Sequence, residues 1–216
     1  ITEHILADLA AGMHFVDIGA NLGYYALLAG LAVGETGSVT AIDANPRMAE
    51  LMRMSASING YDGRMQVIHA AVMDAPGTLS LVVPGKYKGS ATMLRDGLDF
   101  SAFHDTQEVI EVPADTLEGL IGRRRIDVMK IDAEGAEPFI YDGARSLIAD
   151  NPDIRIYMEF GALMMGEERA AQLADKCLED GFRIRRIDHR GAGGLMEVTR
   201  RELLSGELHE LYLTRA

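Results

Sequence analysis

Three acidic residues gather in one short segment, where their spacing suits proton transfer or metal binding. The segment Asp132-Ala-Glu-Gly-Ala-Glu137 follows the apolar run of residues 127–131. Asp132 and Glu134 project to the same side if the chain stays extended there. Either carboxylate has the chemistry of a general base toward a hydroxyl group. Glu137 is expected instead in the first turn of the following helix, where the helix dipole favours an acid.

The residue types leave a second role open for the same carboxylates, which is the binding of Mg²⁺. Glu159 ends another apolar run and adds carboxylate oxygens to those of Asp132 and Glu134. The sequence does not decide between base and metal. Three histidines are alternative bases, of which the first is expected to be structural because it lies in an apolar strand: His69, His104 and His189.

A glycine-containing turn near the amino end has the form of a ligand-binding loop. Residues 15–23 read Phe-Val-Asp-Ile-Gly-Ala-Asn-Leu-Gly, which predicts a strand, a tight turn and the start of a helix. The dinucleotide pattern Gly-x-Gly-x-x-Gly fails, because Asn21 and Tyr24 stand where its second and third glycines belong. Asp17 ends the strand, and a carboxylate suits a cationic group such as an ammonium better than a pyrophosphate.

Asp43 ends the next predicted strand and is the second candidate ligand-binding acid. An acid at this position accepts hydrogen bonds from the hydroxyls of a ribose. Asp43 or Asn45 would alternatively cap the helix that begins at Pro46. The glycine turn upstream favours ribose binding. S-adenosylmethionine has an ammonium, a sulfonium and a ribose diol but no diphosphate, so these residues point to that cofactor.

The elements that must position these residues alternate between strand-like and helix-like segments. This alternation predicts a parallel sheet covered by helices on both faces. Carboxyl ends of parallel strands meet at one edge, so acids at four such ends predict one concave acidic site. The strands expected in this sheet are residues 14–18, 39–42, 65–72, 127–131 and 154–160, with terminal strands at 182–187 and 210–213. One domain is expected over residues 1–216, with residues 84–107 inserted as a lid or binding loop.

Composition excludes several classes of partner. A net charge of −12 argues against nucleic acid, whose phosphates need a basic surface. No apolar run reaches the roughly 18 residues of a membrane span. The single cysteine, Cys177, excludes an internal disulfide and is expected to be a buried small hydrophobe. A chain with one cysteine and no disulfide suits a reducing compartment, so a cytoplasmic location is expected.

Several motifs together resemble one known family. They are "FVDIGANLGYYALLAG", "AIDANP", "ADTLEGLI", "VMKIDAEGAEPFIYDGARSLI" and "YMEF", in this order over roughly residues 12–163. This combination resembles the FkbM family of S-adenosylmethionine-dependent methyltransferases. Asp43 departs conservatively from the pattern, because members often carry Glu there.

The resemblance implies a fold, an activity and a set of site residues. The fold would be the Rossmann-like class I methyltransferase fold, an α/β architecture with a seven-stranded, mostly parallel sheet. Asp43 would hold the ribose hydroxyls, while Asp132 and Glu134 would be catalytic. The implied cofactor-binding residues are Asp17, Gly19, Asn21, Gly23, Asp43, Ala44, Ala71, Val72 and Asp132.

The function expected from these observations is transfer of the methyl group of S-adenosylmethionine to a hydroxyl. By resemblance, the small-molecule or glycan acceptor would be a sugar, a glycolipid or a secondary metabolite. A nicotinamide-dependent oxidoreductase is the rival enzyme, and the failed glycine pattern counts against it. A non-catalytic cofactor-binding module of a larger polypeptide is the other alternative, which the start at Ile1 leaves open. The acids of residues 132–137 argue for chemistry, because a pure sensor has no need of them.

Overall fold

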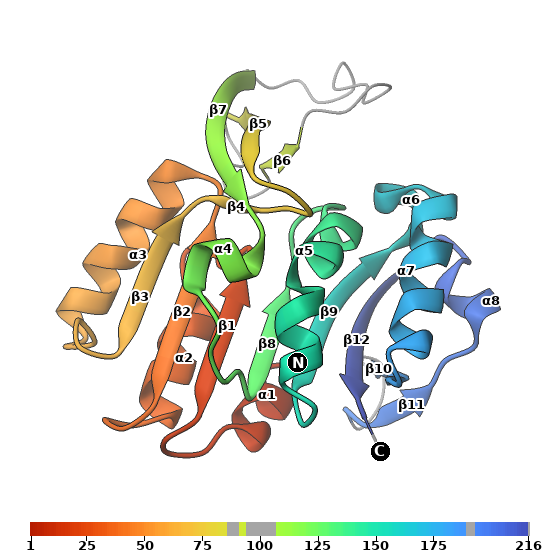
Figure 1. Ribbon diagram of the computed structural model, residues 1–216, viewed down its shortest axis with the longest axis horizontal. Helices are drawn as coiled ribbons and strands as arrows, with labels where there is room; N and C mark the ends of the chain where they lie inside the picture. Colours follow the sequence, from red (N-terminus) through yellow and green to blue (C-terminus); the bar gives the residue numbers. More distant parts are fainter. Residues whose placement is uncertain (86–90, 94–106, 189–192, 216) are drawn as a thin grey trace.

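The computed structural model describes residues 1–85, 91–93, 107–188 and 193–215. Its main sheet has eight strands in the order β11-β10-β12-β9-β8-β1-β2-β3 (Figure 1). Five neighbouring strands are parallel: β1 (His14–Ile18), β2 (Ser38–Asp43), β3 (Met65–His69), β8 (Val128–Ile131) and β9 (Arg155–Gly161). Antiparallel pairing adds the other three: β12 (Leu208–Thr214), β10 (Arg183–Ile187) and β11 (Leu195–Glu197).

Helices cover both faces of this sheet, as the alternation of segments predicts. One apolar core lies beneath three helices, α1 (Thr2–Asp8), α2 (Tyr24–Ala32) and α3 (Pro46–Ile58). The opposite core lies beneath α4 (Leu117–Ile121), α5 (Glu137–Asp150) and α7 (Glu167–Glu179). Short helices α6 (Ala162–Met165) and α8 (Arg200–Leu203) follow β9 and β11. Cys177 on α7 is buried and has a free thiol, as expected.

A second, four-stranded sheet lies beyond the carboxyl ends of the parallel strands (Figure 1). Its order is β4-β7-β5-β6, with β4 (Ala71–Val72), β5 (Gly77–Pro84), β6 (Thr92–Met93) and β7 (Gln107–Asp115). The predicted strand over residues 65–72 is therefore two strands, because β3 ends at His69 and β4 pairs with β7. The main sheet also has eight strands where seven were expected, since β11 adds an edge strand beside β10.

The predicted insertion of residues 84–107 falls partly outside the described residues. Its described part includes β6, which pairs with β5 in the second sheet. A lid function for this insertion and a single domain over residues 1–216 stay predictions. Within the described ranges, no helix is both long and apolar enough to cross a membrane.

Candidate active site

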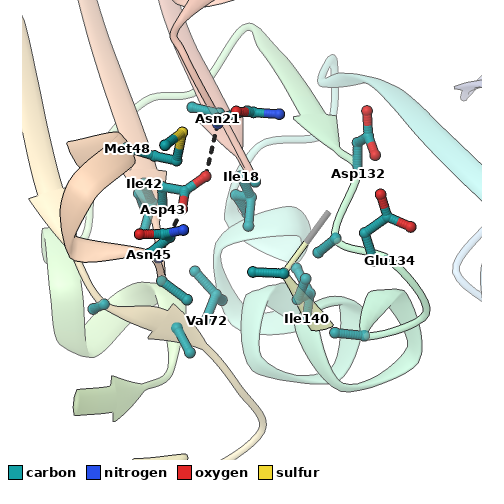
Figure 2. A pocket seen from close by; sticks show the side chains of 18 of the residues that line it. Ile18, Asn21, Ile42, Asp43, Asn45, Met48, Val72, Asp132, Glu134 and Ile140 are labelled. Atoms are coloured by element: carbon teal, nitrogen blue, oxygen red, sulfur yellow. Dashed lines mark hydrogen bonds between the residues drawn. The ribbon is translucent and has the colours of Figure 1, made fainter. Parts of the chain in front are cut away.

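A cavity of about 450 Å³ opens at the carboxyl ends of the parallel strands. Its walls come from the turns after β1, β2 and β8, from the end of β9, and from the second sheet. In Figure 2, Asn21 and Asp43 lie on one side, and Asp132 and Glu134 lie across the cavity from them. The volume and the mixed lining are those of a small-molecule site.

Asp43 connects two of the turns that form the cavity. Its Oδ2 accepts a hydrogen bond from the Asn21 backbone N–H at 2.7 Å, and its Oδ1 accepts one from the Asn45 N–H at 2.8 Å. Asn45 provides the cap of α3, because its side-chain oxygen accepts from the Arg47 N–H at 3.0 Å. Burial raises the pKa of Asp43, and the two N–H donors oppose that rise. Each carboxylate oxygen keeps a further lone pair for a ligand hydroxyl.

The turn between β1 and α2 depends on glycine at its first position. Gly19 has a φ of 73°, and a Cβ there would collide with the backbone carbonyl of Asp132. The strand ends β1 and β8 therefore approach closely, and the backbone at Gly19 borders the cavity. Asn21 also has a positive φ, of 52°, which Asn tolerates better than most residues. Gly23 precedes α2 but does not line the cavity.

Lys130 is a site residue that the sequence prediction missed. It lies opposite Asp17 in the pairing of β8 with β1, and its side chain is only 4% exposed. Its Nζ is 2.8 Å from Asp132 Oδ2, 3.9 Å from Asp17 Oδ1 and 4.9 Å from the centre of the Tyr25 ring. Burial disfavours the charged form, but Asp17 and Asp132 outweigh it and hold the pKa of Lys130 above its usual value.

Asp17 lies below the cavity rather than in its wall. The residue is 0% exposed, and neither carboxylate oxygen has a hydrogen-bond partner among the described residues. Burial raises the pKa of Asp17 to about 6, while Lys130 opposes the rise. Because Asp17 and Lys130 are cross-strand partners, their side chains share the face of the sheet that α2 covers, but only Lys130 lines the cavity. The nearest charged partner of Asp17 is Lys130, and the expected contact of Asp17 with a cofactor stays a prediction.

The turn after β8 holds the predicted catalytic acids. Asp132 and Glu134 both line the cavity, although Glu134 has a φ of 52° and the chain is not extended as assumed. Glu137 is the first residue of α5, as expected. Its Oε1 accepts hydrogen bonds from the Ala133 N–H at 2.8 Å and the Gly135 N–H at 3.2 Å. Glu137 thus closes the turn that presents the other two acids.

Glu159 at the end of β9 also lines the cavity. Burial raises its pKa to about 8, and the charges of Asp132 and Glu134 add to the rise. The described residues nevertheless contain no group of three or more His, Cys, Asp or Glu placed to hold a metal ion. The structure therefore does not support the alternative that these carboxylates bind Mg²⁺. Of the three histidines, His69 Nε2 is 3.1 Å from the carbonyl oxygen of Ala44, and the other two lie outside the described residues.

Most of the predicted site residues surround this one cavity. Those that line it are Gly19, Asn21, Asp43, Ala44, Ala71, Val72, Asp132 and Glu134. Asp17 and Gly23 do not line it. Glu159, which the sequence analysis grouped with Asp132 and Glu134, lines the cavity as well. The main lining residues that the prediction missed are Tyr24, Tyr25, Met48, Met93 and Lys130. A lysine within the apolar run of residues 127–131 was the available signal, because a buried cation needs an acidic partner.

Comparison with known proteins identifies the family. A family model described as the methyltransferase FkbM domain matches residues 17–190. The chain belongs to this FkbM family. The match covers the cavity residues from Ile18 to Glu159 and, except for Phe15 and Val16, all of the motifs in the predicted resemblance. No curated protein sequence matches the chain.

Solved structures share the Rossmann-like fold of this FkbM domain. An FkbM methyltransferase from Methylobacillus flagellatus has a TM-score of 0.53 and 16% identity, with 95% of this chain and 44% of that one covered. A SAM-dependent O-methyltransferase from Thermotoga maritima has a TM-score of 0.52 and 15% identity, and the alignment covers 100% of this chain and 64% of that one. An O-methyltransferase from Bacillus cereus, solved with S-adenosylhomocysteine, has a TM-score of 0.56 and 12% identity, and the alignment covers 99% of this chain and 78% of that one. This chain thus spans less than two thirds of the first two proteins.

Proposed function

We propose that this FkbM domain binds S-adenosylmethionine and transfers its methyl group to a hydroxyl of a sugar, glycolipid or secondary metabolite. The observation that carries the proposal is the arrangement of Asp43 and Asp132 on two walls of one cavity. Asp43 is fixed by two backbone N–H groups, and Asp132 is fixed by Lys130. Both carboxylates are thus held in place before a ligand arrives.

The chemistry of the walls fits the parts of this cofactor. Asp43 has free lone pairs for the two ribose hydroxyls, which is the role of the acid in nucleotide-binding folds. Apolar side chains near it suit an adenine ring, and they include Ile42, Met48 and Val72 (Figure 2). The acids across the cavity suit the ammonium and the sulfonium. When bound, S-adenosylmethionine supplies a methyl group on a positively charged sulfur.

A hydroxyl acceptor is favoured by the carboxylates around the second half of the cavity. A hydroxyl loses its proton as its oxygen attacks, and a nearby carboxylate is a suitable base. The protein also aligns the attacking oxygen with the methyl carbon. This alignment is the larger part of catalysis in such displacements. Because Asp132, Glu134 and Glu159 border this region, an anionic acceptor would be repelled.

Calorimetric titration tests the cofactor half of the proposal. Wild-type chain should bind S-adenosylmethionine and S-adenosylhomocysteine, and should not bind a nicotinamide dinucleotide. Asp43→Asn keeps the shape but loses the charge, so both nucleosides should bind about 10- to 100-fold more weakly, as for hydrogen bonds to a charged group. Glu179→Gln on the exposed face of α7 is the control and should bind as wild type. Well-folded wild-type protein that binds neither nucleoside would overturn the proposal.

Screening tests the acceptor half. Wild-type chain is incubated with S-adenosylmethionine and a panel of methyl glycosides, glycolipids and phenols, and formation of S-adenosylhomocysteine is followed. Formation of this product that depends on an acceptor supports the proposed methyltransferase activity. Binding of the cofactor without turnover across the whole panel favours the non-catalytic cofactor-binding module.

A further inference from the structure

The register of the sheet arranges cavity residues in one row along its carboxyl edge. Ile18 pairs with Ile131, and Ile131 pairs with Met158. One residue further along each strand come Gly19, Asp132 and Glu159, which therefore stand side by side. On the far side of β9, Glu159 pairs directly with Glu210 of β12. From the ribose-binding side to the far side, the row reads Asp43, Gly19, Asp132, Glu159 and Glu210.

This row has a direction with respect to the proposed methyl transfer. Asp43 stands at the end where the proposal places the ribose, and Gly19 leaves the next position free of a side chain. Asp132 follows, and it is held by Lys130 at 2.8 Å. Glu159 is the next member of the row, beyond Asp132 and away from the ribose side, and it lines the cavity. An acceptor that approaches the methyl group from the far side meets Glu159.

Glu159 and Glu210 form a pair of acidic side chains at this far end. They are cross-strand partners, a placement that brings the β-carbons of two residues to about 5 Å. Both side chains are half-buried, and burial raises the pKa of each. The acidic groups that face Glu159 are Asp132 and Glu134 from the turn after β8, Glu137 from α5 and Glu210 from β12. Lys130, the nearby cation, is engaged by Asp132 and Asp17.

We propose that Glu159 is the base that accepts the proton of the acceptor hydroxyl, and that the acids around it, with Glu210 as its cross-strand partner, keep Glu159 protonated until the positive charge of the cofactor is bound. The proposal rests on the proposed function. In the transfer, the acceptor oxygen forms its bond to the methyl carbon, and the electron pair of the carbon–sulfur bond goes to sulfur. The hydroxyl proton goes to the Glu159 carboxylate. The proton that Glu159 carries beforehand leaves to solvent when the cofactor binds.

The number of protons released when S-adenosylmethionine binds tests this proposal, and the measurement needs no known acceptor. Wild type and Glu159→Gln are titrated with S-adenosylmethionine at pH 7 in two buffers of different ionisation enthalpy. The slope of the measured enthalpy against buffer enthalpy counts the protons released. With a pKa of about 8, Glu159 is about 90% protonated at pH 7, so wild type should release up to ~0.9 proton more than Glu159→Gln. The amino group of the ligand titrates in both proteins, so the difference isolates the side chain.

Three controls make the result specific. S-adenosylhomocysteine has no positive sulfur, so the difference between wild type and Glu159→Gln should shrink to near zero with this ligand. Glu210→Gln removes one of the four acidic groups that face Glu159, so proton release at pH 7 should be lower than in wild type but higher than in Glu159→Gln. Glu179→Gln should release as many protons as wild type. If Glu159→Gln does not fold, Glu210→Gln carries the same test.

The outcomes separate this proposal from the proposed function. Equal proton release in wild type and in both Gln variants would overturn the role of Glu159, even if the cofactor binds well. Failure of both nucleosides to bind wild type would instead overturn the proposed function. With any methyl glycoside that wild type methylates, Glu159→Gln should lose about 100-fold or more in kcat, with KM for the cofactor within about twofold. A retained kcat would also contradict the proposal.

Discussion

Replacement of Lys130 by Met should destabilise the protein in a way that depends on pH. Lys130 is the charged partner of Asp17, which is fully buried and lacks any hydrogen-bond partner among the described residues. Without Lys130, the Asp17 carboxylate would be left uncompensated, and it would take up a proton instead. The pH dependence of stability therefore reports directly on this pair.

The magnitude follows from the pKa of Asp17. Its pKa is about 6 in the folded protein, against an ordinary value of 3.8, so the buried position of Asp17 costs about 3 kcal/mol at pH 7 in wild type even with Lys130 beside it. Because the folded pKa is raised, this loss of stability accumulates as the pH rises from about 4 to about 6 and is constant above 6. In Lys130→Met the pKa rises further, so stability continues to fall by about 1.4 kcal/mol for each pH unit above 6.

Urea denaturation at pH 6, 7 and 8 measures this difference. The free energy of unfolding of Lys130→Met should fall progressively below that of wild type across this range. Asp17→Asn combined with Lys130→Met removes the titrating group, so its difference from wild type should not change with pH. If Lys130→Met lies below wild type by the same amount at pH 6 and pH 8, the pairing of Lys130 with Asp17 does not act as described.

Two further substitutions test the cavity. Asp132→Asn should weaken binding of S-adenosylmethionine about tenfold more than binding of S-adenosylhomocysteine, because only the former carries a sulfonium charge. Equal weakening of the two ligands in calorimetry would contradict a role of Asp132 beside the sulfur. Gly19→Ala should lower the free energy of unfolding by more than ~2 kcal/mol, since it adds a backbone collision to the strain of a positive φ. Gly181→Ala, at a positive φ with open space around the Cβ, is its matched control, and equal losses in the two variants would contradict the close approach at Gly19.

The sequence predicted the elements that carry strong local signals. The run of residues 14–18 forms β1 at the predicted residues, and Asn45 with Pro46 starts α3 where proline at the first position was expected. Glu137 begins α5, where a helix dipole favours an acid. These features depend on residues close in sequence, so they are visible without a structure.

Features that depend on tertiary contacts were missed. Residues 65–72 form one apolar run without a turn signal, and only pairing with β7 shows that Ala71 and Val72 belong to a second sheet. The register also places Lys130 beside Asp17, a pairing that depends on the contact between two strands. The pair of Glu159 and Glu210 joins residues far apart in the chain, so no local pattern predicts it.

A crystal structure of the protein with S-adenosylhomocysteine tests the central claim most directly. The account predicts both ribose hydroxyls within about 3.2 Å of the Asp43 carboxylate, the homocysteine chain passing over Gly19, and the sulfur close to Asp132. A nucleoside bound outside the cavity, or inside it with no contact to Asp43, would contradict the account.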